Sequence, residues 1–161
     1  MVQVTLPDGS VRSFDGNAVP VSDVLASIGG RLQKDTVAVL FGGELRDIHQ
    51  NISGDGTFRA LRDGDEESLY VLRHTASHVL ALAVQDLFPN VKLAIGPPID
   101  TGFYYDFDLG KDEHGKPRTF APEDLERIEA RMGEIIARDT PVRREELPWE
   151  RAKEIFESEG E

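Results

Sequence analysis

Residues 73–107 have the sequence RHTASHVLALAVQDLFPNVKLAIGPPIDTGFYYDF, which contains the only two closely spaced histidines of the chain, His74 and His78. In a helix, a spacing of four places both imidazoles on one face, one turn apart. The stiff segment Gly96-Pro97-Pro98 follows this helix, and a run of aromatic residues around Tyr105 comes next. A histidine pair beside a rigid turn and an aromatic strand is typical of a pocket.

The helix that carries the histidines is predicted to begin at Asp63 or Asp65, whose carboxylates can accept hydrogen bonds from the first-turn N–H groups. It is predicted to run to Phe88, because Pro89 follows. At 100° per residue, its apolar side chains form one stripe, and the histidines fall about 160° from the centre of that stripe. The stripe comprises Leu69, Leu72, Ala76, Val79, Leu80, Ala83 and Leu87. The histidine pair therefore faces either solvent or a second surface, and both interpretations stay open.

Two strands are predicted on either side of the Gly-Pro-Pro segment, at residues 91–95 and 103–107. Phe103, Tyr105 and Phe107 share one face of the second strand, which is equally typical of a core strand and of a pocket wall. Further on, a polar surface loop is predicted at residues 109–118. Lone loop histidines such as His114 and His49 are expected to be surface residues.

Two more helices are predicted at residues 122–137 and 149–157, joined by an extended segment at 141–147. Pro122 suits the first turn of a helix, and the acidic residues Glu123 and Asp124 beside it favour the positive end of the helix dipole. The chain then stops without a capping structure, so we expect the domain to continue beyond Glu161 in the complete protein.

Residues 1–62 are predicted to form a small unit of their own. Pro7-Asp8-Gly9-Ser10 is a turn signal, and Gly42-Gly43 is a hairpin signal. The elements are strands at 2–6, 11–14, 36–41, 44–46 and 57–61 and a helix at 23–28 capped by Ser22. This order predicts an α+β fold of the β-grasp type, a mixed sheet crossed by one helix; another ubiquitin-sized α+β module is the alternative. We therefore expect two domains, 1–62 and 63–161.

The charge of the chain is uneven, which also favours two units. The net charge is −12; residues 1–62 hold 6 basic and 7 acidic residues, a net −1, and residues 63–161 hold 12 and 23, a net −11. Nucleic-acid affinity comes mainly from Lys and Arg, so the second unit is not expected to bind nucleic acid nonspecifically. The first unit can still share an RNA contact. No run of residues predicts a membrane helix or a signal peptide.

The absence of cysteine excludes disulfides and thiolate metal ligands within the chain and weakly favours a reducing compartment. A His-x-x-x-His pair supplies two metal ligands where zinc needs three or four, so no metal site is expected here. As acid–base groups, imidazoles with pKa values near neutrality suit ester hydrolysis. The chain holds neither a Gly-rich phosphate-binding motif nor a Ser-His-Asp arrangement.

The stretch from Arg73 to Leu109 resembles the start of the editing domain of bacterial threonyl-tRNA synthetases. Residues 1–62, with VTLPDGSVRSF and FGGELRD, resemble the TGS domain that precedes it in this family. The histidine pair alone is a weak signal, but together with AIGPPIDTGFYYDF and the first unit it is specific. Editing domains of alanyl-tRNA synthetases share the paired histidines but lack the TGS unit and the Gly-Phe-Tyr-Tyr-Asp run.

The resemblance implies a class II ligase that joins threonine to tRNA(Thr) using ATP, Mg²⁺ and a zinc ion held in a catalytic domain outside this chain. It implies that the present region contributes to hydrolysis of mischarged seryl-tRNA(Thr). Serine lacks one methyl group of threonine, which gives only about 1–3 kcal/mol of discrimination, so a second hydrolytic sieve is needed.

By the same resemblance, His74 and His78 belong to the editing site, with His74 ordering the water. Gly96, Pro97 and Tyr105 match positions that bind substrate. The family completes this site with a Cys-x-x-x-His pair that the chain lacks, so we expect the chain alone to have little or no activity. The family further implies a cytoplasmic protein that dimerises through the catalytic domain, with this region monomeric.

Two alternatives remain at this point. TGS units also occur in regulatory proteins that contact RNA or the ribosome, but such proteins are not expected to carry the histidine helix and the GFYYDF strand. A free-standing hydrolase of mischarged tRNA would need a complete site within the chain.

Overall fold

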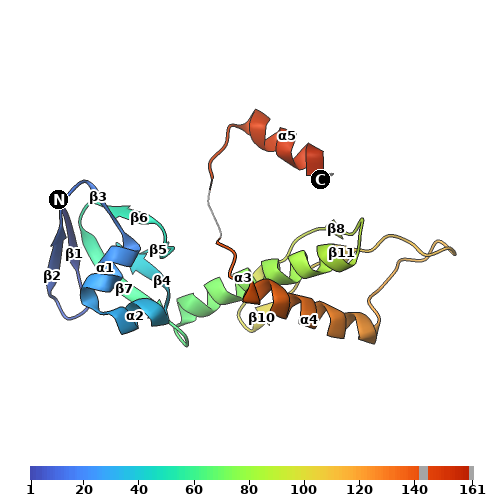
Figure 1. The fold of residues 1–161 in the computed structure, drawn as a ribbon, viewed down its shortest axis with the longest axis horizontal. Coiled ribbons are helices and arrows are strands. Elements are labelled where there is room, and N and C mark those ends of the chain that lie inside the picture. Colours follow the sequence, from blue (N-terminus) through green and yellow to red (C-terminus); the bar gives the residue numbers. More distant parts are fainter. Residues whose placement is uncertain (142–144, 160–161) are drawn as a thin grey trace. The chain divides into compact units, whose positions relative to one another are not determined.

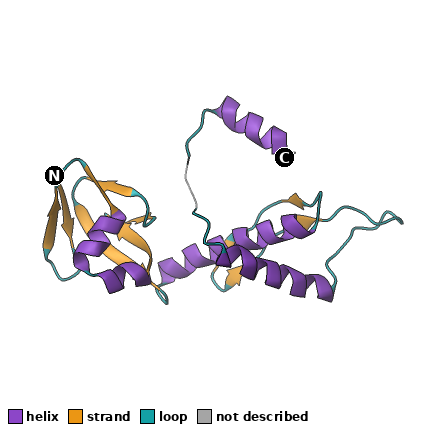
Figure 2. Ribbon diagram, in the orientation of Figure 1, coloured by secondary structure: helices purple, strands orange, loops and turns teal. Residues whose placement is uncertain are grey.

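The computed structural model describes residues 1–141 and 145–159, and the chain divides into two compact units, Met1–His74 and Thr75–Glu161. Both units combine helices with strands (Figures 1 and 2), which confirms the predicted α+β class. Among the described residues, no helix is long and apolar enough to cross a membrane.

The first unit contains a five-stranded mixed sheet with the strand order β2-β1-β7-β4-β5. β1 pairs with β7 in parallel and with β2 antiparallel, and β4 pairs antiparallel with both β7 and β5. A separate antiparallel pair joins β3 and β6. The elements are β1 (Val2–Thr5), β2 (Val11–Phe14), β3 (Ala18–Pro20), α1 (Val21–Ile28), α2 (Gly30–Asp35), β4 (Thr36–Phe41), β5 (Glu44–Arg46), β6 (Asn51–Ser53) and β7 (Gly56–Arg62).

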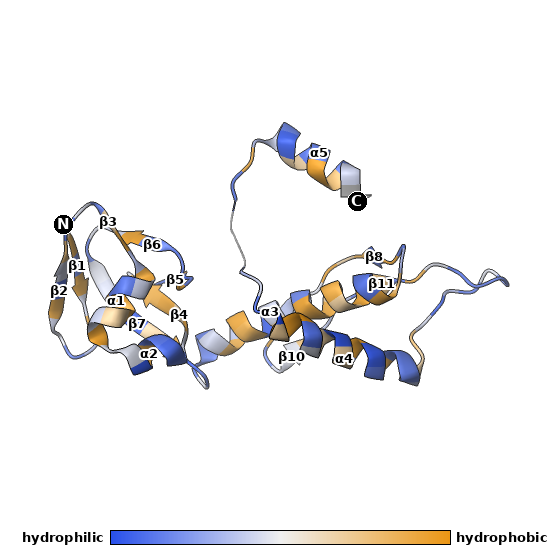
Figure 3. Ribbon diagram, viewed as in Figure 1, coloured by the Kyte–Doolittle hydropathy of each residue, from blue (hydrophilic) through white to orange (hydrophobic). Residues whose placement is uncertain are grey.

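The core of this unit lies between α1 and the sheet. α1 contributes Val21, Val24 and Leu25, which recur at helical spacing and are almost fully buried. β4 is hydrophobic after its first residue, Thr36 (Figure 3), and Val39 in its middle is fully buried. The two-residue loop between β4 and β5 consists of two glycines with positive φ, which is the geometry that a tight hairpin turn requires.

All five strands predicted for the first unit are present, with ends within one residue of the predicted ones. The predicted helix cap at Ser22 is wrong. α1 begins at Val21, its N-cap is Pro20, and Ser22 lies inside the helix with its hydroxyl 3.5 Å from Asp23 Oδ1. β3, β6 and α2 were not predicted, because segments of three to six residues without a clear period give no sequence signal.

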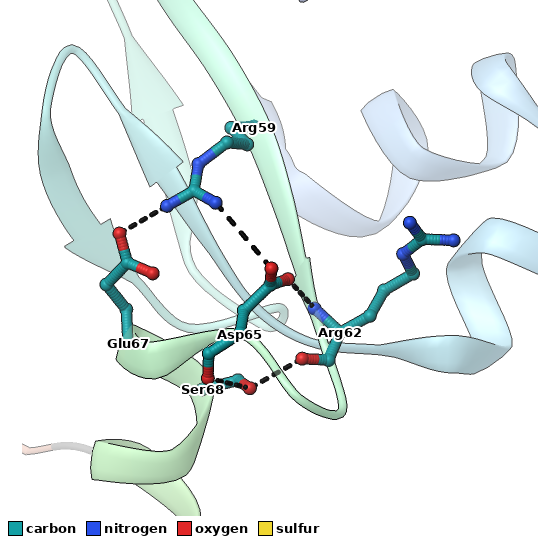
Figure 4. Close-up of polar contacts among 5 residues, drawn as sticks. All are labelled: Arg59, Arg62, Asp65, Glu67 and Ser68. Carbon is teal, nitrogen blue, oxygen red and sulfur yellow. Dashed lines mark hydrogen bonds and ion pairs between the residues drawn. The ribbon is translucent and has the colours of Figure 1, made fainter.

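A network of polar contacts fixes the start of α3 (Glu66–Leu87) to the end of β7 (Figure 4). The Arg62 N–H donates to Asp65 Oδ2 at 2.7 Å, and Arg59 forms ion pairs with Asp65 and Glu67. The fully buried Ser68 hydroxyl lies 2.5 Å from the Arg62 carbonyl oxygen and 2.8 Å from that of Asp65. The Asp65 carboxylate thus binds the preceding strand rather than the first-turn N–H groups that the sequence predicted.

The second unit packs α4 (Pro122–Ala137) against the second half of α3. The cluster has Ala83, Val84 and Ile128 at its centre. Around them lie Leu80, Leu87, Phe88, Val91, Phe107, Phe120, Met132 and Ile135. α4 has the predicted bounds, and α5 (Trp149–Glu159) extends two residues beyond its prediction. Residues 142–144 of the predicted extended segment lie outside the described residues.

Charged groups also join α3 to α4. Arg131 donates through Nε and Nη2 to Asp86 Oδ2 at 2.8 and 2.6 Å, and through Nη1 to Glu134 at 2.5 Å. These hydrogen bonds, the one to Asp86 first, raise the pKa of Arg131 above its ordinary value. Because the Arg131 side chain is only 24% exposed, the pair ties the two helices at a partly covered position.

The two strands predicted at 91–95 and 103–107 are shorter and interrupted. They form two-residue ladders, β8 (Lys92–Leu93) with β11 (Phe107–Asp108) and β9 (Pro98–Ile99) with β10 (Gly102–Phe103). Leu93 pairs with Phe107, and Pro98 pairs with Phe103. Pro98 follows Leu93 by five positions, whereas Phe107 follows Phe103 by only four. The extra residue is a bulge, and the prolines of this segment lack the N–H group that a continuous ladder requires.

The predicted apolar stripe of α3 is partly wrong. Leu80, Ala83 and Leu87 do pack into the core, but Leu72 is 41% exposed. Ser77 and Ala81, which lie outside the predicted stripe, are 0% and 4% exposed. The buried face is therefore rotated by about 60° toward the histidines.

Candidate functional site

His74 and His78 both lie on α3, one turn apart, with exposed side chains. His74 belongs to the first unit, where its ring makes an edge-to-face contact with Tyr70 at a centroid distance of 6.3 Å. His78 belongs to the second unit. The predicted sharing of one helix face follows directly from the unbroken helix.

Small buried residues border the histidines on the same helix. Ser77 precedes His78, and Ala81 is three residues after it, so the pair lies at the edge of the buried face of α3. This differs from the predicted position nearly opposite the core. An imidazole at the edge of a packed face can contact a bound group on one side and solvent on the other. It can therefore exchange a proton with water while it contacts that group.

Gly96 and Tyr105 contact each other closely within the second unit. A Cβ atom added at Gly96 would lie 2.0 Å from Tyr105 Cδ2 and 2.4 Å from Cε2, so the aromatic ring occupies the space that any other residue would fill. Tyr105 also stacks on Phe107, with ring centroids 4.9 Å apart at an angle of 20°. Phe107 in turn makes an edge contact with Phe120.

The predicted substrate-binding residues thus form one cluster around the bulge. Gly96, Pro97 and Tyr105 are all half-buried, and Pro97 follows Gly96 directly. Hydrogen bonds from the Ala94 N–H to the Asp106 carbonyl and from the Asp106 N–H to the Ile95 carbonyl, both 3.1 Å, hold the two strands together beside it. The structure therefore places the five predicted site residues in two groups, a histidine pair on α3 and a Gly-Pro-Tyr cluster at the bulge.

Metal ligands do not gather in either group. Among residues 1–141 and 145–159, no cluster of three or more His, Cys, Asp or Glu side chains is arranged to hold a metal ion. The chemistry that these residues offer is that of imidazole as a proton acceptor and of the Tyr105 hydroxyl as a hydrogen-bonding group.

Sequence reasoning missed two arginines that line a cavity of the second unit, Arg118 and Arg127. Arg118 precedes α4 and Arg127 lies within it, so no short motif connects them. The only available signal was an arginine pair in a segment with a strong excess of acidic residues.

Comparison with known proteins adds an independent observation. No protein-family model matches the chain. Over 161 residues it is 44% identical to the threonine–tRNA ligase of Symbiobacterium thermophilum and 46% identical to that of Aromatoleum aromaticum. It is 45% identical to the threonine–tRNA ligase of Thiobacillus denitrificans. Each of these alignments covers 100% of the chain.

The chain belongs to the threonine–tRNA ligase family. This confirms the resemblance inferred from the histidine helix, the GFYYDF strand and the first unit. The chain spans about a quarter of the length of these relatives, 24% in each case. The family relationship therefore concerns a region of the ligase.

Proposed function

We propose that the chain is the amino-terminal region of a threonine–tRNA ligase and contributes to hydrolysis of seryl-tRNA(Thr). The complete protein would join threonine to tRNA(Thr) in the cytoplasm, using ATP and Mg²⁺. That reaction, its zinc ion and the dimer interface would belong to parts of the protein outside this chain. The observation that carries the proposal is similarity along all 161 residues to ligases of this one specificity.

The first domain, residues 1–62, would be a TGS domain of the β-grasp type. The strand order β2-β1-β7-β4-β5, with the central parallel pair β1–β7 and α1 against the sheet, supports this assignment. Residues 63–161 would be the first part of the editing domain. The end of β7 at Arg62 and the start of α3 at Glu66 support a change of element at this point, and the polar contacts of Asp65 and Ser68 with Arg62 hold the two elements together.

The chemistry of the editing site would be ester hydrolysis. His74 would order and deprotonate the attacking water, and His78 would assist from the next turn of the same face. Gly96 and Pro97 would offer backbone groups to the seryl moiety, with the Tyr105 hydroxyl as a hydrogen-bonding partner. The close Gly96–Tyr105 contact supports this role, because a ring seated against backbone leaves its hydroxyl in a defined place.

The 161-residue chain alone would be an incomplete editing site, without the Cys-x-x-x-His pair of the family, and would exist as a monomer. Incubation of the purified chain with seryl-tRNA(Thr) should release serine no faster than buffer does. The complete protein, given threonine, ATP, Mg²⁺ and tRNA(Thr), should form threonyl-tRNA(Thr). Failure of the complete protein to charge tRNA(Thr) would refute the assignment, and deacylation by the chain alone would favour a free-standing hydrolase.

A further inference from the structure

A cavity of about 340 Å³ opens in the second unit where α3 ends and α4 begins. Its walls include Phe88 and Val91 after α3, Thr119 and Arg118 before α4, and Arg127 from the second turn of α4. Two arginines therefore line one concave site within residues 63–161, whose net charge is −11.

Arg127 is held in place from two sides. Its Nη1 donates to Asp124 Oδ1 at 3.1 Å, and its guanidinium lies 5.9 Å from the centroid of the Phe88 ring. Phe88 is itself fixed by an edge contact with Phe120, with centroids 5.3 Å apart. A guanidinium has five N–H donors, so the single bond to Asp124 leaves several that can bind an incoming acceptor.

The backbone N–H of Arg118 is hydrogen-bonded. The Arg118 N–H donates to the Gly110 carbonyl at 2.9 Å, at the base of the loop closed by the Lys111–Pro117 bridge. No hydrogen bond or ion pair joins the Arg118 guanidinium to another described residue. Asp124 is the acidic residue of the cavity, and its Oδ2 already accepts the Ala121 N–H at 3.0 Å.

A neighbouring cavity on the same two helices has a different balance of charged residues. It is about 420 Å³ in volume and combines Arg127 and Arg131 with the carboxylates of Asp86 and Glu134. Arg131 pairs with both of these carboxylates. The cavity with Arg118 thus carries two cations and one anion, and it favours a bound anion, whereas its neighbour is balanced.

We propose that Arg118 and Arg127 form a phosphate-binding site for the RNA backbone. The guanidinium fork matches two oxygens of a phosphodiester, and the concave site limits access by competing water. This inference rests on the proposed function in one respect, namely that the protein has an RNA partner. It explains how a strongly acidic unit engages a polyanion, through one local cationic site that contacts a single phosphate.

Binding of a fluorescein-labelled acceptor-stem hairpin of tRNA(Thr) to the 161-residue chain, followed by fluorescence anisotropy across a range of salt concentrations, tests the site. Arg118→Gln should weaken binding about tenfold and lower the slope of log K against log salt by about one. Arg118→Lys should keep the slope, because the charge remains, and lose part of the affinity. The matched control Arg138→Gln, an exposed arginine at the end of α4 outside the cavity, should change neither quantity.

Unchanged RNA binding by Arg118→Gln would overturn the proposal, as would absence of RNA binding by the unaltered chain. Parallel titration with inorganic phosphate, followed by NMR of the arginine side chains, separates the two sources of phosphate. Inorganic phosphate could bind at Arg118 while Arg118→Gln leaves RNA affinity unchanged. That result would identify a site for free anions and would also overturn the proposal. Charging of tRNA(Thr) by the complete protein is measured independently, so failure at Arg118 leaves the proposed function standing.

Discussion

The Tyr105 ring lies against Gly96 so closely that a methyl group at position 96 would be 2.0 Å from its Cδ2 atom. Glycine is therefore required here for space and not for backbone conformation, since Gly96 is not among the residues with positive φ. The contact crosses the bulge between the two short ladders and continues through the Tyr105–Phe107 stack into the core of the second unit. A substitution at Gly96 should consequently shift side chains both at the candidate site and in the core of the second unit.

Gly96→Ala should displace the Tyr105 ring and lower the free energy of unfolding of the second unit by about 1–3 kcal/mol, the usual cost of overpacking. The NMR signals of the Tyr105 and Phe107 rings should shift together, and urea denaturation gives the free energy. Gly102→Ala is the matched control in the same hairpin, because nothing lies within 4 Å of its added Cβ. Equal effects of the two substitutions would contradict the steric explanation.

Ser68→Ala should loosen the junction between β7 and α3. The buried hydroxyl donates to the Arg62 carbonyl at the end of β7, and loss of this hydrogen bond should cost about 0.5–1.5 kcal/mol. Native-state hydrogen exchange of the β7 amides measures the change. Ser27→Ala removes a similar bond, 2.7 Å to the Val24 carbonyl, from an exposed serine of the same unit and should cost less than about 0.5 kcal/mol.

Ser10→Ala should raise the pKa of Asp8. In the folded chain, hydrogen bonds from the Ser10 hydroxyl, at 2.6 Å, and from its N–H, at 2.9 Å, hold the pKa of Asp8 below the ordinary value of 3.8. A carboxyl group whose pKa falls on folding stabilises the fold above its unfolded pKa and loses that contribution as the pH drops through the folded pKa. An NMR titration of the Asp8 carboxyl carbon measures the shift. Ser13→Ala on β2 should leave the pKa of Asp8 unchanged. An unchanged Asp8 pKa in Ser10→Ala would show that the Ser10 hydroxyl does not lower it.

Much of the first unit could be predicted because its signals are local. The alternation of residues 2–5, the Pro7–Ser10 turn and the two glycines after β4 each specify a strand or a turn by themselves. The short strands β3 and β6 depend instead on partners distant in sequence, as the pairing of Val19 with Ile52 shows. Local patterns cannot reveal such pairings.

In the second unit, the apolar period predicted α4 within its actual bounds but misplaced the buried face of α3. Ser77 and Ala81 are small enough to be covered closely, and a stripe defined by large apolar residues overlooks them. The histidine pair was predicted from spacing alone, whereas the Gly96–Tyr105 contact depends on a bulge. A bulge changes register without leaving a clear sequence pattern.

The most direct test of the account is the effect of His74→Ala on the complete protein that carries this region. Hydrolysis of seryl-tRNA(Thr) and formation of threonyl-tRNA(Thr) are measured side by side, with His114→Ala in the exposed loop as the matched control. The account predicts that His74→Ala slows deacylation by about 100-fold or more, the contribution of a positioned acid–base group, while the charging rate stays unchanged. Deacylation that survives His74→Ala, or that falls equally in His114→Ala, would contradict it.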